Sequence, residues 1–179
     1  MTVLKNEIKI NKIPLLIWSL SIGLMIAMCV CMFPEMEKEM DNVNKIFSSM
    51  GNFTAAFGMD KLNFGTLIGF YAVEGGSILG IGGAFYAAIT GITALMNEEK
   101  NRTAEFLMTH PLTRARVVTE KLLAVVAQIT LVNLIVLLLG VGSIKIIGES
   151  MDWKQLLLLH LAYYLMQIEI AGICFGISA

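Results

Sequence analysis

The chain has 179 residues, of which 56% are hydrophobic and 15% are charged, and its mean hydropathy is +0.74. Soluble domains are nearer one quarter charged, so this composition excludes an ordinary soluble domain. The formal net charge of −1 gives no basis for nucleic-acid binding.

Four long apolar runs organise the sequence. A helix that crosses a membrane needs about 20 mostly apolar residues, and of the 27 charged residues only Glu74 and Glu169 fall inside these runs. The sequence therefore predicts an all-α, polytopic membrane protein in which residues 1–179 form a single transmembrane domain with four spanning helices. The predicted spans are Pro14–Phe33, Leu62–Met96, Leu122–Ile144 and Leu156–Ala179.

The segment before the first span, residues 1–13, is basic and amphipathic, with Leu4 and Ile8 among its lysines. It is predicted to be an interfacial helix that lies in the plane of the membrane surface. Pro14 suits the first turn of the helix that follows, because that turn does not need its N–H. The apolar stretch is too long for a cleaved signal peptide and reads as a retained signal anchor.

Residues 34–61 connect the first two spans and contain a helical pattern of their own. Apolar residues recur every three or four positions between Glu35 and Met50, and Gly51 is a natural stop. This pattern predicts an extracytoplasmic amphipathic helix that packs on the membrane or on the spans. A role in gating the entry of a substrate is the alternative.

The second run, residues 62–96, is longer than one span needs and is rich in small residues. The length predicts a tilted helix with an entry segment at the membrane surface. Small side chains at every fourth position let helix backbones approach closely in lipid. One such row is predicted to be a helix-packing face, and a neighbouring row contains Gly83, Ala87 and Gly91. The predicted packing row is Gly76, Gly80, Ala84 and Ala88.

Polar residues inside the second, third and fourth spans are candidates for function. Ionisable groups within a membrane are costly and therefore point to a site, so Glu169, Gln167 and Glu74 are possible pathway residues, with Glu169 expected to face a cavity. Gln128 and Asn133 are more simply hydrogen-bonding links between helices. Gly172 and Gly176 form a second small pair in the fourth span.

The three cysteines lie in the membrane segments and are expected to be packing residues. No His or carboxylate supports a metal site beside them, so no metal and no catalytic residue is predicted. The fourth run extends to the last residue. This favours an incomplete copy of a longer protein, because a chain that stops inside a span lacks the segment after it.

The distribution of basic residues sets the predicted orientation. Residues 1–13 and 97–121 lie on the same side of a four-span layout and together hold eight Lys and Arg residues, whereas residues 34–61 and 145–155 hold five. Because basic residues accumulate in cytoplasmic loops, the N-terminus and residues 97–121 are predicted to be cytosolic.

The cytosolic connector, Asn97–Lys121, is the most charged stretch between the spans. Its sequence is NEEKNRTAEFLMTHPLTRARVVTEK. Pro111 divides it, because the residue before a proline disfavours helix, and Thr113 can cap a second helix that continues into the third span. The result is a short, exposed element tied to two spans, which suits contact with a soluble partner.

Three pieces of this connector resemble the permease subunit of ABC-2 type ABC transporters. They are EEKNRTAEFL from Glu98, PLTR from Pro111 and EKLL from Glu120. In that family, acidic residues end the second span, and a G-T-x-E-x-L-L stretch, a P-[VLI]-[ST]-R stretch and a Lys at the third span follow. The present chain departs from this pattern at Arg102, where glycine is usual, and at Phe106, where leucine is usual. The family has six spans, whereas four are predicted here.

The resemblance implies that residues 97–121 form a coupling helix docked on a separate ATP-binding cassette ATPase. The implied interface residues are Glu98, Glu99, Glu105, Phe106, Leu107, Pro111, Arg114 and Arg116. The chain has no Gly-Lys pair and hence no phosphate-binding loop of the G-x-x-x-x-G-K-[ST] kind, so ATP and Mg²⁺ are expected in the partner.

By the same resemblance, the chain is expected to be a non-enzymatic permease subunit of the bacterial inner membrane. It would pair with a second permease copy or a paralogue and export a peptide, drug or lipid-like compound by alternating access. One rival reading is a non-catalytic membrane scaffold or assembly subunit. The other is an intramembrane CAAX-type metalloprotease, suggested superficially by Glu98, Glu99, Arg102, Phe106 and His110.

Overall fold

The computed structural model describes residues 2–38, 66–100 and 114–178. This part of the chain is helical and contains no strand, and four of its helices are long and apolar enough to cross a membrane. The predicted fold class, an all-α membrane protein with four spanning helices, is confirmed. The elements are α1 (Thr2–Ile10), α2 (Lys12–Lys38), α5 (Leu67–Phe70), the π-helix η2 (Tyr71–Gly75), α6 (Gly76–Lys100), α8 (Arg114–Ile147) and α9 (Trp153–Ile177).

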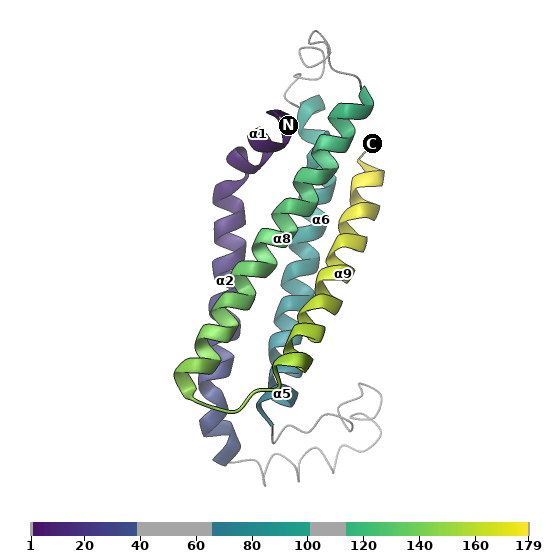
Figure 1. Cartoon of the computed structure of the whole chain (residues 1–179). Coiled ribbons are helices and arrows are strands. Elements are labelled where there is room, and N and C mark those ends of the chain that lie inside the picture. The colour runs from purple at the N-terminus through teal and green to yellow at the C-terminus, as the bar shows by residue number, and fades with distance from the viewer. Residues whose placement is uncertain (1, 39–65, 101–113, 179) are drawn as a thin grey trace.

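The long helices form an elongated bundle in which the chain runs up and down along one axis (Figure 1). α2 packs mainly on α8, and α6 packs mainly on α9, while α8 also contacts both members of the second pair. α1, the end of α6 and the start of α8 lie at one end of the bundle, and α5 and the α8–α9 connection lie at the other (Figure 1).

The core of the bundle is built from apolar stripes at helical spacing. Ile22, Ile26, Val30 and Phe33 of α2 are nearly fully buried, as are Val125, Ile129, Val132 and Val136 of α8, and all belong to one hydrophobic cluster. Spacings of three and four residues place each set on one helix face. The opposite faces carry exposed apolar side chains such as Met28 and Leu138, as expected of helices that face lipid.

α2 continues beyond the predicted end of the first span. The prediction placed the end at Phe33, before Pro34, but the helix passes through Pro34 and ends at Lys38. A proline inside a helix removes only one backbone hydrogen bond and can be tolerated when packing holds the helix on both sides. Phe33 supplies such packing, since it is 2% exposed and its ring contacts that of Phe70, with centroids 5.6 Å apart and the planes tilted by 52°.

Within the described residues the second span begins at Leu67, and the predicted start at Leu62 lies outside them. The Thr66 hydroxyl caps it by accepting a hydrogen bond of 3.3 Å from the Gly69 N–H. A single π-helical turn then joins α5 to α6 without a break. Such turns insert one residue into a helix and are frequent at functional sites, and this one positions Tyr71 towards the bundle interior.

α8 is the longest element, with 34 residues. At 1.5 Å per residue it spans about 50 Å, which exceeds the hydrocarbon thickness of a bilayer. It therefore extends beyond the lipid core, and its first turns continue the connector as one helix into the third span. α8 ends before Gly148, which has a φ of +74° and so adopts the left-handed conformation typical of a helix C-terminus.

Candidate functional site

A buried lysine joins three helices where the charged connector meets the bundle. Lys121 of α8 is 1% exposed, and its Nζ donates to Glu7 Oε1 of α1 at 2.8 Å and to the Ala94 carbonyl of α6 at 2.7 Å. Glu7 in turn accepts from the Asn11 amide at 3.4 Å. We name these residues the Lys121 junction: Lys121, Glu7, Ala94 and Asn11. It ties α1 to the two helices that flank the connector.

The electrostatic reason for this arrangement is the cost of burying an ammonium group. A buried charge is tolerated only when an opposite charge and hydrogen bonds replace its water shell. The Glu7 carboxylate supplies the opposite charge, and the Ala94 carbonyl of α6 supplies a second hydrogen-bond acceptor. This ion pair is therefore one of the contacts that hold α1 to the spans.

A second ion pair lies beside the junction on α8. Arg116 Nε donates to Glu120 Oε1 at 3.2 Å; the Arg116 side chain is 60% exposed, whereas that of Glu120 is 11% exposed. Arg116 thus stays accessible on the surface next to the connector.

The structure places the predicted coupling residues only in part. Glu98 and Glu99 lie in the last turn of α6, and Arg114 is the first residue of α8. Arg116 is exposed as described above. Glu105, Phe106, Leu107 and Pro111 lie outside the described residues, so the coupling interface stays a prediction.

Two members of the predicted packing row of α6, Gly76 and Gly80, lie against α9. A Cβ atom added to Gly76 would lie 2.8 Å from the Tyr163 hydroxyl oxygen, and one added to Gly80 would lie 3.0 Å from Tyr163 Cε1. Ala84 and Ala88 are half-buried on the same helix. The tightest approach between the helices uses the neighbouring row, since a Cβ at Gly91 would lie 2.6 Å from the Ala171 carbonyl oxygen.

Gln167 links three helices by hydrogen bonds in the centre of the bundle. It is 1% exposed, its Oε1 accepts from Asn133 Nδ2 of α8 at 2.7 Å, and its Nε2 donates to the Leu79 carbonyl of α6 at 3.4 Å. Its amide also lies beside Gly83, so a side chain added there would have to displace it. These contacts are those of a structural link between helices.

A double-mutant cycle tests the strength of this link. Replacing Asn133 and Gln167 by alanine, singly and together, is expected to give a coupling energy of about 0.6 kcal/mol, and below about 1.7 kcal/mol, which is the range for such bonds in membranes. The free energy of unfolding is measured by titration with sodium dodecyl sulfate in mixed micelles. Ser143 bonds within its own helix, to the Gly140 carbonyl at 2.8 Å, so a cycle between Ser143 and Gln167 should give no coupling. Equal coupling energies in the two cycles would contradict the assignment of Asn133 and Gln167 as a hydrogen-bonded link between helices.

The other two predicted pathway residues lie on the surface of the described bundle. Glu74 and Glu169 are both exposed, Glu74 on the π-helical turn and Glu169 on α9. Gln167 is thus the buried member of the predicted set, and the structure does not bring the three together. A pathway role for them stays a prediction.

The π-helical turn brings a buried tyrosine to the fourth span. Tyr71 is 1% exposed, and its hydroxyl oxygen lies 2.8 Å from His160 Nε2 of α9, which is itself 6% exposed. The Tyr71 hydroxyl also lies where a side chain at Gly140 of α8 would have to go. The pair therefore joins the entry segment of the second span to the two spans that follow.

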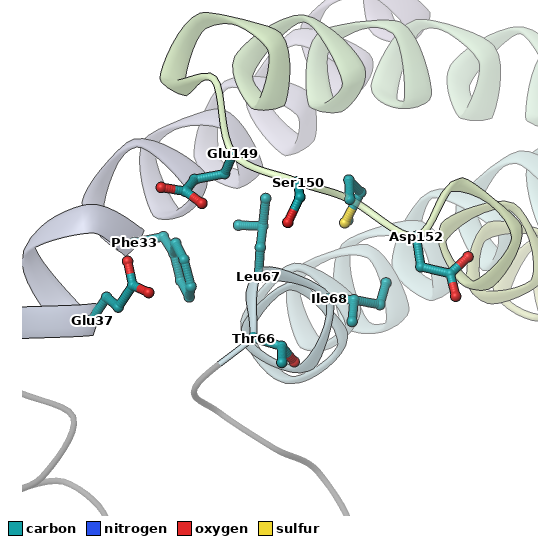
Figure 2. A pocket seen from close by; sticks show the side chains of 9 residues that line it. Phe33, Glu37, Thr66, Leu67, Ile68, Glu149, Ser150 and Asp152 are labelled. Carbon is teal, nitrogen blue, oxygen red and sulfur yellow. The ribbon is translucent and has the colours of Figure 1, made fainter.

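The end of the bundle opposite the Lys121 junction carries a cavity of about 450 Å³. Figure 2 shows Phe33 and Glu37 on α2, Thr66, Leu67 and Ile68 at the start of α5, and the α8–α9 connection around them. The charged side chains of its lining are acidic: Glu37, Glu149 and Asp152. Asp152 Oδ1 is occupied as the cap of α9, since it accepts from the backbone N–H groups of Lys154 and Gln155 at 3.0 and 3.2 Å.

Sequence reasoning missed two buried contacts, the Lys121–Glu7 pair and the Tyr71–His160 pair. Lys121 was grouped with the exposed charges of the connector, although it directly precedes an apolar run, as a buried lysine at a span end would. His160 stands alone among leucines in the fourth run. No sequence signal identifies its partner, because 89 residues separate it from Tyr71.

Comparison with known proteins gives one match. A family model described as "ABC-2 family transporter protein" matches residues 1–179. No curated protein and no solved structure matches the chain. The family match covers the whole chain, including the connector and the four spanning helices.

Proposed function

Because the chain belongs to the ABC-2 family of transporter proteins, and is therefore a membrane permease of the ABC transporter type, we propose that it couples an ATP-binding cassette ATPase to substrate export. The ATPase, which would hold ATP and Mg²⁺, docks on residues 97–121 at the cytosolic face of the bacterial inner membrane. A second permease copy or a paralogue completes the transporter. The exported compound is peptide, drug or lipid-like, by analogy with the family.

The Lys121 junction is the observation that best supports this coupling role. The connector leaves α6 at Lys100 and enters α8 at Arg114, and Lys121 joins both of these helices to α1 through contacts of 2.7 and 2.8 Å. A force applied to the connector therefore reaches three helices as one unit. ATP shifts the permease between inward and outward access only if ATPase contacts differ between these two states.

The test is whether an ATPase binds the chain through the connector. The tagged full-length chain, purified from its native membranes in mild detergent, is expected to bring down an ATP-binding cassette ATPase. The double substitution Arg114→Glu and Arg116→Glu should reduce the recovered ATPase at least tenfold, because two repulsive charges replace two attractive ones in the interface. Recovery is measured by quantitative mass spectrometry.

The matched control carries the same charge change at the opposite end of the bundle. Lys145→Glu and Lys154→Glu alter two exposed lysines near the α8–α9 connection and should leave ATPase recovery unchanged. If no ATPase is recovered with the unmodified chain, the scaffold alternative is favoured. If both double variants recover as much ATPase as the unmodified chain, the proposed docking face is wrong.

A further inference from the structure

A crevice of about 250 Å³ lies between α8 and α9, away from the Lys121 junction. It is lined by four leucines and four polar side chains, with no charged residue among them: Thr130, Asn133, Leu134, Leu137, Leu157, His160, Leu161 and Tyr164. Leu134, Leu157 and Leu161 are 50–55% exposed, so the mouth of the crevice opens on the face of the bundle that meets lipid.

Two of the polar lining residues each retain an atom without a hydrogen-bond partner in the described part of the chain. His160 is 6% exposed and Asn133 is 9% exposed, and their unpaired atoms are His160 Nδ1 and Asn133 Oδ1. The other two polar residues satisfy each other, since the Thr130 and Tyr164 hydroxyl oxygens lie 3.0 Å apart. Buried polar groups are almost always paired, and an unpaired one costs about 1–3 kcal/mol.

The chemistry of these two atoms defines what can pair with them. Asn133 donates through Nδ2 to Gln167 and to the Ile129 carbonyl, so its Oδ1 needs a donor. Nε2 of His160 is engaged by the Tyr71 hydroxyl at 2.8 Å, so Nδ1 is a donor or an acceptor according to the tautomer. A hydroxyl group can donate to Asn133 Oδ1, and it can donate to or accept from His160 Nδ1 in either tautomer. An amide N–H can donate to Asn133 Oδ1. A charged group would be costly in an apolar crevice that offers no countercharge.

We propose that the α8–α9 crevice binds an uncharged membrane amphiphile, whose hydroxyl or amide group pairs with Asn133 and His160 while its hydrocarbon chain lies along the leucines. Entry occurs sideways from the lipid, through the mouth formed by Leu134, Leu157 and Leu161. The crevice lies between α8 and α9, whereas the Lys121 junction joins α8 to α1 and α6. Binding of the amphiphile is measured without an ATPase, so each proposal can fail without the other.

The test compares two photoreactive probes on the full chain in phosphatidylcholine nanodiscs. One probe is dodecanol with a mid-chain diazirine, and the other is the same chain with a terminal methyl group in place of the hydroxyl. Mass spectrometry then measures labelling of the peptides that contain Leu134, Leu157 and Leu161. The alcohol should label them about fivefold more than the hydrocarbon, the ratio given by one net hydrogen bond, and unlabelled dodecanol should compete.

Three variants separate the crevice from the general lipid surface. Leu161→Trp fills the mouth without removing a polar group and should reduce alcohol labelling several-fold, whereas Leu138→Trp, at a 69% exposed position outside the crevice, should not. Asn133→Leu should lower labelling by the alcohol probe to nearly the level of the hydrocarbon probe. Circular dichroism and size-exclusion elution establish that each variant is folded.

Three outcomes would overturn the proposal. The first is equal labelling of the unmodified chain by both probes, which would mean that water pairs with the two atoms. The second is alcohol labelling that Leu161→Trp leaves unchanged. The third is the absence of alcohol labelling together with disulfide formation between copies carrying Leu161→Cys, which would mean that a second chain covers the crevice.

Discussion

Replacing Lys121 by methionine is expected to destabilise the bundle by about 3 kcal/mol, the lower end of the range for breaking a buried ion pair. Methionine keeps the unbranched shape of the side chain, one atom shorter, but leaves the Glu7 carboxylate and the Ala94 carbonyl without the ammonium group. Glu7 is 17% exposed, against 1% for Lys121, so water can reach part of the carboxylate and moderate the cost. The free energy of unfolding in mixed micelles, titrated with sodium dodecyl sulfate, measures the effect.

The control substitution is Lys145→Met, which removes an exposed lysine from the other end of the same helix. It should change the free energy of unfolding by less than about 0.5 kcal/mol. Glu7→Gln should lower the free energy of unfolding at least as much as Lys121→Met, because it leaves the Lys121 ammonium, the more deeply buried of the two charges, without its countercharge. The double variant Glu7→Gln with Lys121→Met should then recover part of the loss. Similar values for Lys121→Met and Lys145→Met would show that the ion pair does not hold α1 to the spans.

The second large loss of stability is expected from Gly91→Ala, which adds a single methyl group. The added Cβ would lie 2.6 Å from the Ala171 carbonyl oxygen and 3.2 Å from Ala171 Cα. These are backbone atoms, so no side-chain rotation can relieve the contact and α9 must move away from α6. Overpacking of this kind costs about 1–3 kcal/mol, although alanine is the better helix former. The same detergent titration measures it.

Gly172→Ala and Gly142→Ala provide the matched controls. Both glycines lie within spanning helices, α9 and α8, and an added Cβ meets nothing within 4 Å at either position. These substitutions should be neutral or stabilising by up to about 1 kcal/mol, because alanine restricts the unfolded chain and favours helix. If Gly91→Ala behaves like the two controls, the α6–α9 interface is looser than the structure shows.

The glycine controls also show where residue type alone is ambiguous. Gly172 and Gly176 have the four-residue spacing expected of a packing face, yet open space surrounds both in the described structure. Gly83 and Gly91 have no more distinctive spacing, yet they lie at the closest approach of α6 and α9. Spacing identifies which residues share a helix face, but which face meets a neighbour depends on how the helices pack.

The sequence by itself determined the four spanning helices and the continuity of the connector with the third span. Unbroken apolar runs can satisfy their backbone groups in lipid only as helices, and no glycine or proline interrupts the chain between Arg114 and Gly140. The family pattern around Glu98, Pro111 and Glu120 was equally readable, and the family match over residues 1–179 agrees with it. These are local features, fixed by composition and by short spacings.

Only the tertiary structure decided which polar groups are buried and what they bind. Lys121 pairs with Glu7 across 114 residues, and Tyr71 pairs with His160 across 89 residues, so neither contact has a local signature. The passage of α2 through Pro34 likewise depends on packing around Phe33 rather than on helix propensity. The physical reason is that burial is a property of the assembled bundle, whereas helix formation in lipid is already required of each segment alone.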